Sequence, residues 1–207
     1  MKIFPALITF LQKNARFSLV VLLFALSASA SAQSGTYEKK GLKKSYAYVS
    51  LVKSGNQVHA EIFTWLDTPS GQTGYYNGKG ALSGNTGVLK SDENEPECKV
   101  TLKLLSGKLQ VTYANCAVDH LPADFNGVYT KITDATAGDY VVIAPKAYFH
   151  EKANEASKLK SYVVKGDKVQ LEMENITPGN WVLVSFVTND GRETRGFIPL
   201  AQLKKVL

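Results

Sequence analysis

The sequence of 207 residues has little cysteine and little histidine, with two and three residues respectively. The three histidines stand alone in separate segments, at His59, His120 and His150, so neither residue type can form the clusters that hold structural zinc. The motifs G-x-S-x-G, H-E-x-x-H and G-x-x-x-x-G-K-[ST] are also missing, which argues against serine hydrolases, zinc proteases and P-loop proteins. We therefore predict that the protein is not an enzyme and uses no cofactor or metal.

Acidic residues are missing from the first 32 positions. Basic residues, among them Lys13 and Arg16, precede an apolar run at 17–26, and the small residues that follow end in Ala30-Ser31-Ala32. This order is typical of a cleaved secretory signal peptide, and the apolar run is shorter than the roughly 18 residues that a membrane span needs. We predict that residues 1–32 are a signal peptide. The remaining chain is then exported, periplasmic or extracellular, and not stably inserted in a membrane.

The chain also lacks a strong excess of one charge once that peptide is set aside. The whole sequence has 24 basic and 18 acidic residues, and the first 32 positions hold three of the basic ones, which leaves a net charge of +3. Nucleic-acid-binding proteins usually carry a basic patch or stripe, whereas the lysines here occur in short pairs such as Lys39-Lys40. We expect no nucleic-acid partner.

The two cysteines, Cys98 and Cys116, flank a segment with alternating apolar residues. Pairing across a Ser106-Gly107 turn gives one apolar face. The pairs on that face are Leu104 with Leu109, Leu102 with Val111, and Val100 with Tyr113. Cys98 then lies opposite Asn115, one residue short of Cys116, and the Cα separation of roughly 4.4–6.8 Å in disulfides tolerates this offset. In an exported protein, we therefore predict a Cys98–Cys116 disulfide at the end of a β-hairpin.

Residues 33–132 alternate almost throughout and predict a β-meander. A second hairpin is expected across a Ser54-Gly55 turn, with Ala47, Val49 and Leu51 opposite Ile62, Ala60 and Val58 respectively. Phe63 and Trp65 lie on the strand face opposite Val58, Ala60 and Ile62; if the sheet closes, one of these two sets lines the interior and the other must be covered or used. The segments 35–39 and 127–131 are similar, GTYEK and GVYTK, and suit the first and last strands of a closed sheet. We predict an up-and-down, barrel-like domain of about eight strands.

The sequence pattern changes after residue 132. Small polar residues at 133–138 indicate a linker, and residues 139–207 predict short strands joined by tight turns. The second segment contains, in this order, Tyr162, Val164, Gly166, Asp167, Val169, Trp181, Val182, Gly196 and Phe197. In these positions it resembles the bacterial Src homology 3 (SH3) family, with Phe197 in place of the family's common Trp. The resemblance implies a small five-stranded β-barrel that binds a ligand and is often attached to cell-wall enzymes. The N-terminal domain is loosely similar to small secreted lipocalin-like barrels, including periplasmic inhibitors of lysozyme-type enzymes.

Three residues of the C-terminal segment are candidates for ligand binding. Tyr148, Trp181 and Arg192 could line a groove for peptide or glycan, through aromatic stacking and charge-assisted hydrogen bonds. The alternative is that Trp181 and Phe197 are core residues, because a small domain has few other large side chains to bury. Loss of folding on replacing Trp181 would indicate the core, and loss of ligand alone would indicate the groove.

Two functions remain open. One is a non-enzymatic envelope binding protein that recognises peptidoglycan or an envelope protein through its SH3-like domain. The other is a periplasmic inhibitor or immunity protein that blocks a secreted hydrolase. A wall binder should associate with sacculi directly, whereas an inhibitor should form a tight one-to-one protein complex.

Overall fold

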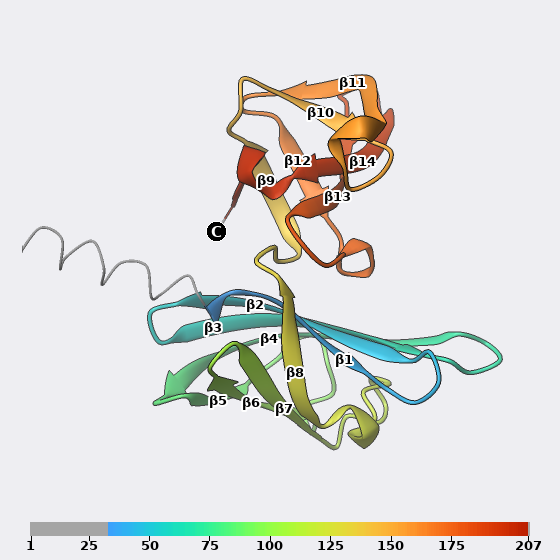
Figure 1. Ribbon diagram of the computed structural model, residues 1–207. Helices are drawn as coiled ribbons and strands as arrows, with labels where there is room; N and C mark the ends of the chain where they lie inside the picture. The colour runs from blue at the N-terminus through green and yellow to red at the C-terminus, as the bar shows by residue number, and fades with distance from the viewer. Residues whose placement is uncertain (1–32, 207) are drawn as a thin grey trace, which may run out of the picture.

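The computed structural model describes residues 33–206, so the predicted signal peptide lies outside the described residues. It shows an all-β protein with a closed eight-stranded antiparallel barrel followed by a seven-stranded sheet (Figure 1). The predicted fold class, an antiparallel barrel with one disulfide followed by a second small β structure, is confirmed at this level.

Each barrel strand pairs with the next along the chain, and the last pairs with the first. The strands are β1 (Gly35–Lys40), β2 (Tyr46–Ser54), β3 (Gln57–Leu66), β4 (Gln72–Ser83), β5 (Thr86–Leu89), β6 (Lys99–Leu105), β7 (Lys108–Ala114) and β8 (Gly127–Thr133). Tyr37 of β1 pairs with Lys131 of β8 and closes the barrel, as the similar segments predicted. Closure satisfies the backbone groups that an open sheet would leave at its edges.

The cysteine hairpin has the predicted register, with Val100 opposite Tyr113 and Leu104 opposite Leu109. Cys98 and Cys116 form a disulfide with a Cα separation of 4.5 Å. Asn115 lies between the last residue of β7 and Cys116 and has a φ of 60°. Asn tolerates this left-handed conformation better than most residues, and it turns the chain so that Cys116 reaches Cys98 despite the one-residue offset.

The register predicted for the second hairpin is wrong by two residues. Val49 lies opposite Ile62 and Leu51 opposite Ala60, because the two-residue turn is Gly55-Asn56 rather than Ser54-Gly55. Gly55 has a φ of 58°, which is the conformation that a tight hairpin turn demands of its first central residue. A shift of two keeps each side chain on its predicted face, so the separation of inner from outer residues is unaffected.

Large apolar side chains fill the barrel interior. One buried cluster contains the inward residues of all eight strands, including Leu51, Ile62, Leu102, Leu109 and Tyr129. Tyr113 and Tyr129 share a hydrogen bond between their hydroxyl groups at 3.0 Å. The interior is therefore a packed core, as is common in small barrels.

The second sheet has seven strands in the order β11-β10-β14-β13-β12-β9-β15, two more than the five that the resemblance implied. The strands are β9 (Gly138–Val142), β10 (Lys146–His150), β11 (Lys158–Val164), β12 (Lys168–Leu171), β13 (Trp181–Val187), β14 (Glu193–Pro199) and β15 (Leu203–Lys205). Single 3₁₀ turns lie at Ala123–Phe125, Glu155–Ser157, Met173–Asn175 and Leu200–Gln202.

The segment at 133–138, predicted to be a linker, is mostly buried. Ala135, Thr136 and Ala137 are at most 4% exposed. The Thr36 hydroxyl donates to the carbonyl of Ala135 at 2.7 Å, and the amide of Ala137 donates to the Ser50 hydroxyl at 2.8 Å. Small side chains fit here because the segment passes between two packed structures, and the same composition is typical of flexible linkers.

The outer face of β2 and β3 is covered by the second sheet. Phe63 is buried in the hydrophobic cluster of the second sheet, and Tyr46, Tyr48 and Trp65 pack against that cluster. The rings of Tyr46 and Trp65 are stacked with centroids 5.8 Å apart. Side chains from the barrel thus complete the core of the second sheet, and the two parts share one hydrophobic cluster.

Candidate binding site

Trp181 lies at the first residue of β13, at the end of the sheet, where its ring is only partly buried. It walls a hollow of about 410 Å³, which we call the Trp181 pocket; the other lining residues are Glu155, Asn180, Pro199, Leu200 and Ala201. Pro199 pairs with Trp181 across the β13–β14 ladder, so the pocket floor is set by strand register. The volume lies in the range of small-ligand sites.

A buried histidine lies beside the pocket. His150 is 3% exposed, and its ring meets the Trp181 ring edge-on with centroids 4.8 Å apart. Its Nδ1 is 3.3 Å from the carbonyl oxygen of Phe197, and its Nε2 is 3.5 Å from the Glu155 carboxylate. The imidazole therefore lies between the indole and the carboxylate on the pocket rim, and its buried Nε2 forms no hydrogen bond within residues 33–206.

The Glu155 carboxylate comes from the loop between β10 and β11. Ser157 shapes this loop, because its hydroxyl accepts from the amide of Lys152 at 3.0 Å and contacts the carbonyl of Asn154 at 2.9 Å. Sequence reasoning missed both His150 and Glu155 as site residues. Nothing in their five-residue spacing indicates a pair, since a turn brings them together rather than a regular strand or helix.

The three residues predicted to line one groove do not come together. Arg192 lies in the exposed turn after β13, where its Nε donates to Asp190 at 2.8 Å. β13 has seven residues, so roughly 20 Å separates the Trp181 end from the Arg192 end at about 3.3 Å per residue. Tyr148 packs against Tyr162 of β11, with ring centroids 5.7 Å apart, and does not line the Trp181 pocket. Only Trp181 of the three lines the pocket.

The alternative that Trp181 and Phe197 form the core is also not what the structure shows. Both side chains are partly exposed. The second core is built from other buried residues, which include Tyr140, Phe149, Leu171, Val184 and Ile198. Trp181 is therefore free to offer part of its ring to a ligand.

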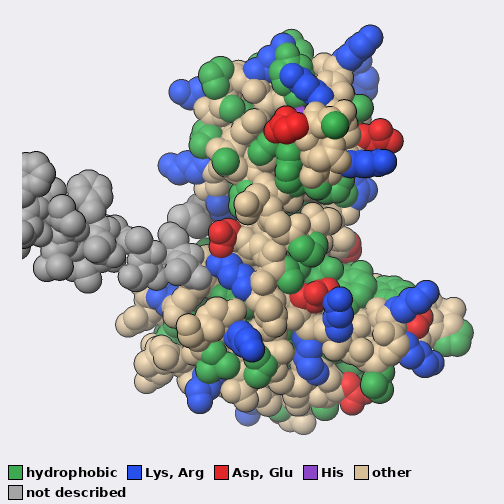
Figure 2. All heavy atoms as spheres, in the orientation of Figure 1, with side chains coloured by type: hydrophobic (Ala, Val, Ile, Leu, Met, Phe, Trp, Pro, Cys, Tyr) green, Lys and Arg blue, Asp and Glu red, His purple; other side chains and the backbone are tan. Residues whose placement is uncertain are grey.

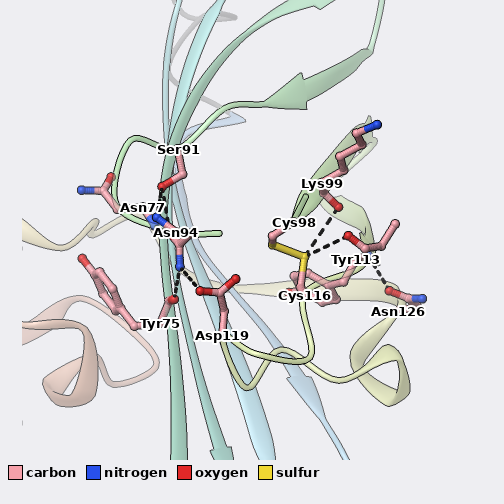
Figure 3. The surroundings of a disulfide bond; sticks show 11 residues. Tyr75, Asn77, Ser91, Asn94, Cys98, Lys99, Tyr113, Cys116, Asp119 and Asn126 are labelled. Atoms are coloured by element: carbon pink, nitrogen blue, oxygen red, sulfur yellow. Dashed lines mark hydrogen bonds between the residues drawn. A yellow bond between two sulfur atoms is a disulfide. The ribbon is translucent and has the colours of Figure 1, made fainter. Parts of the chain in front are cut away.

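The acidic loop at 91–97 is fixed to the barrel by Asn94 (Figure 3). The Asn94 amide donates to the carbonyl of Tyr75 at 2.8 Å and to the carboxylate of Asp119 at 2.9 Å. The hydroxyl of Ser91 donates to the amide oxygen of Asn94 at 2.8 Å. These hydrogen bonds join the loop to the segment after Cys116, so we interpret the network as structural. Within residues 33–206, no group of three or more metal-ligating side chains occurs.

Inside the barrel, Tyr76 is completely buried, and its hydroxyl has no hydrogen-bond partner among residues 33–206. Burial, with a smaller contribution from the nearby Asp119 carboxylate, raises the pKa of Tyr76 to about 12. A phenol with a raised pKa holds its proton through the physiological range and so is not poised for acid–base chemistry there.

A smaller hollow, of about 210 Å³, lies where the barrel meets the second sheet and is lined by residues of both parts, including Glu61, Tyr75, Glu172 and Glu174. The Tyr75 hydroxyl donates to the Glu61 carboxylate at 2.9 Å. Burial and this carboxylate raise the pKa of Tyr75. The Glu61 carboxylate in this hollow already accepts a hydrogen bond from Tyr75. The Trp181 pocket is therefore the better candidate site.

No family model matches the chain, and searches of curated proteins and solved structures find no match to it. The part of the chain that the structure describes contains no helix long and apolar enough to cross a membrane. The site geometry therefore carries the functional argument.

Proposed function

We propose that the protein is a non-enzymatic, exported binding protein that recognises peptidoglycan of the cell envelope through the Trp181 pocket. The observation that carries the proposal is the partly exposed Trp181 ring facing a pocket of about 410 Å³ that also holds the Glu155 carboxylate. The resemblance of residues 139–207 to the bacterial SH3 family, often attached to cell-wall enzymes, supports the wall as the target.

The chemistry of the pocket suits a wall fragment. Peptidoglycan offers sugar rings that can stack on an indole, together with hydroxyl, amide and amine donors for a carboxylate. Trp181, Pro199 and Leu200 supply the apolar wall, and Glu155 supplies the charged acceptor. His150 packs edge-on against the indole and so restricts the Trp181 ring before binding, which lowers the ordering cost of binding.

Export is the second part of the proposal. The Cys98–Cys116 disulfide persists in oxidising compartments such as the periplasm or the cell exterior, and is uncommon in the cytosol of most organisms. The signal-like order of residues 1–32 points the same way. Export would bring the Trp181 pocket to the wall.

Cosedimentation of residues 33–207 with purified peptidoglycan sacculi tests the proposal. We expect saturable binding that soluble wall fragments compete away. Binding that does not saturate, or none at all, contradicts it. A tight one-to-one complex with a secreted hydrolase in the absence of sacculus binding would instead favour the inhibitor function.

The second sheet should not be tested alone. Phe63 of β3 belongs to its hydrophobic cluster, so a fragment that begins at residue 133 loses part of its core. Failure of such a fragment to bind would report misfolding rather than the absence of a site. Point variants in the 33–207 chain avoid this ambiguity.

A further inference from the structure

Strands β10 and β11 lie at the end of the second sheet farthest from the barrel (Figure 1), and both carry lysines and tyrosines. β11 is an edge strand, paired on one side with β10. Alternation along the two strands places five side chains on one face, which we call the lysine–tyrosine face: Lys146 and Tyr148 of β10, and Lys158, Lys160 and Tyr162 of β11. Lys and Arg side chains project from this end of the molecule in Figure 2.

The ammonium groups on this face are held against aromatic rings. Lys146 Nζ lies 3.5 Å from the ring centroid of Tyr162 and 4.9 Å from that of Tyr148. Lys158 Nζ lies 3.6 Å from the ring centroid of Tyr148. The Tyr148 hydroxyl raises the pKa of Lys146, and Lys146 is the leading cause of the lowered pKa of Tyr148. Two cations thus lie against the rings of this face before any ligand arrives.

These lysines differ from ordinary solvated surface lysines in two ways. Edge strands often carry lysine to discourage pairing with other chains, but such side chains need no fixed position. Here the rings fix two of the three ammonium groups. Among the described residues, Lys146, Lys158 and Lys160 form no ion pair, so their charge is not neutralised by a neighbouring carboxylate.

We propose that the lysine–tyrosine face binds a linear, phosphate-bearing polymer of the cell envelope. Charge complementarity requires an anionic ligand, and Lys158 and Lys160 both lie on the edge strand β11, so their charges follow the edge of the sheet. A row of cations along an edge suits an extended polyanion better than a single small ion. The site is separate from the residues that line the Trp181 pocket.

Two other anionic partners fit the face less well. Single-stranded nucleic acid is bound largely by stacking of bases on aromatic rings, and the rings of Tyr148 and Tyr162 are already in contact with ammonium groups. An anionic membrane requires several apolar side chains among the cations, and on this face Val164, opposite Lys146, is the only exposed aliphatic residue of β10 and β11 beside three lysines and two tyrosines.

Long-chain inorganic polyphosphate is a suitable probe, titrated into residues 33–207 and compared with orthophosphate, a single-stranded oligonucleotide and vesicles that contain anionic phospholipid. We expect polyphosphate to bind most tightly, with an affinity that falls as salt is raised. Equal or tighter binding of the oligonucleotide or the vesicles, or no preference over orthophosphate, overturns the proposal.

The charge-removing variant Lys146→Gln/Lys158→Gln/Lys160→Gln should weaken polyphosphate binding by about tenfold, the sum expected for three surface ion pairs. Its matched control is Lys99→Gln/Lys103→Gln/Lys108→Gln, which removes the same charge from exposed positions on the β6–β7 hairpin. The control should bind nearly as the original chain does. An equal loss in both variants means net charge alone is sensed, which contradicts the proposal.

Tyr162→Leu tests the fixed geometry because it keeps every charge but removes the ring under Lys146. It should weaken polyphosphate binding and leave the urea midpoint close to that of the original chain, since Tyr162 is 49% exposed. Unchanged polyphosphate affinity would refute the role of the rings. Trp181→Ala should leave polyphosphate binding intact, which separates this site from the wall-binding proposal.

Discussion

The imidazole of His150 meets the indole of Trp181 edge-on, with centroids 4.8 Å apart and planes at 76°. His150 is buried and also faces Glu155, so one side chain links the aromatic and the charged wall of the pocket. Edge-to-face aromatic pairs contribute about 0.5–1.5 kcal/mol beyond their burial. The arrangement places a rigid ring beside a carboxylate without help from a ligand.

The Glu155 carboxylate should matter for binding but not for folding. Glu155→Gln keeps the shape and removes the charge, and its side chain is 77% exposed, so we expect the free energy of unfolding to change by less than about 0.5 kcal/mol. Binding to sacculi should weaken several-fold. Glu151→Gln, in the same loop but outside the pocket lining, is the control. If the two changes weaken binding to sacculi equally, binding depends on the charge of the loop and not on the pocket.

Phe63 should support both parts of the molecule. Phe63→Ala leaves a cavity in the shared hydrophobic cluster, which we expect to reduce the free energy of unfolding by about 3–4 kcal/mol. Urea unfolding measures the loss, and amide hydrogen exchange should show faster opening in β12 and β13 than before. Val128→Ala, at an exposed position of β8, is the control. If exchange in the second sheet is unaffected by Phe63→Ala, the barrel does not support that sheet.

Loss of the disulfide should weaken the barrel. The bond closes a loop with a sequence separation of 18, and the chain-entropy model assigns about 3 kcal/mol to a loop of this size. Cys98→Ala/Cys116→Ala should therefore unfold at a lower urea concentration but keep its β-rich circular dichroism. A variant that is as stable as the original protein would show that the hairpin and Asn115 hold this end without the bond.

Alkaline stability should depend on Tyr76. Its pKa is raised from 10.0 to about 12 in the folded protein, so above pH 10 the unfolded chain releases this proton first. The stability linked to Tyr76 is complete below pH 10 and is lost as the pH rises toward 12.

Tyr76→Phe removes this ionisation together with a hydroxyl that has no partner among residues 33–206. Urea unfolding should give a change of no more than about 1 kcal/mol at neutral pH. As the pH rises above 10, the free energy of unfolding of the variant should increase relative to that of the original protein. If the free energies of unfolding of the two proteins change in parallel above pH 10, the ionisation of Tyr76 does not cause the loss of stability there.

The sequence predicted the barrel because the alternating residues and the similar first and last strands obey local rules of pleat and pairing. The register of the Cys98–Cys116 hairpin followed from Gly107, whose φ of 66° fits a two-residue turn. The turn at Gly55 was misplaced because Ser54, Gly55 and Asn56 are all acceptable turn residues, and sequence alone does not rank them.

The site was harder to predict because it depends on tertiary contacts. Trp181 was identified by its residue type, but His150 and Glu155 reach it through a turn and a strand ladder whose register short motifs do not specify. The buried segment at 133–138 was interpreted as a linker, since small residues suit both flexible and tightly packed chains. One face of the β2–β3 hairpin was expected to need cover, but the sequence did not show that it is the face with Phe63 and Trp65 or that the second sheet covers it.

The most direct test of the wall-binding account compares two variants of β13 in sacculus cosedimentation, each with its urea midpoint measured. Trp181→Ala removes the pocket wall, and Phe186→Ala removes a partly buried ring of the same strand that lines a different hollow. The account predicts that Trp181→Ala folds but loses saturable binding, whereas Phe186→Ala still binds. Retained binding by folded Trp181→Ala would contradict it.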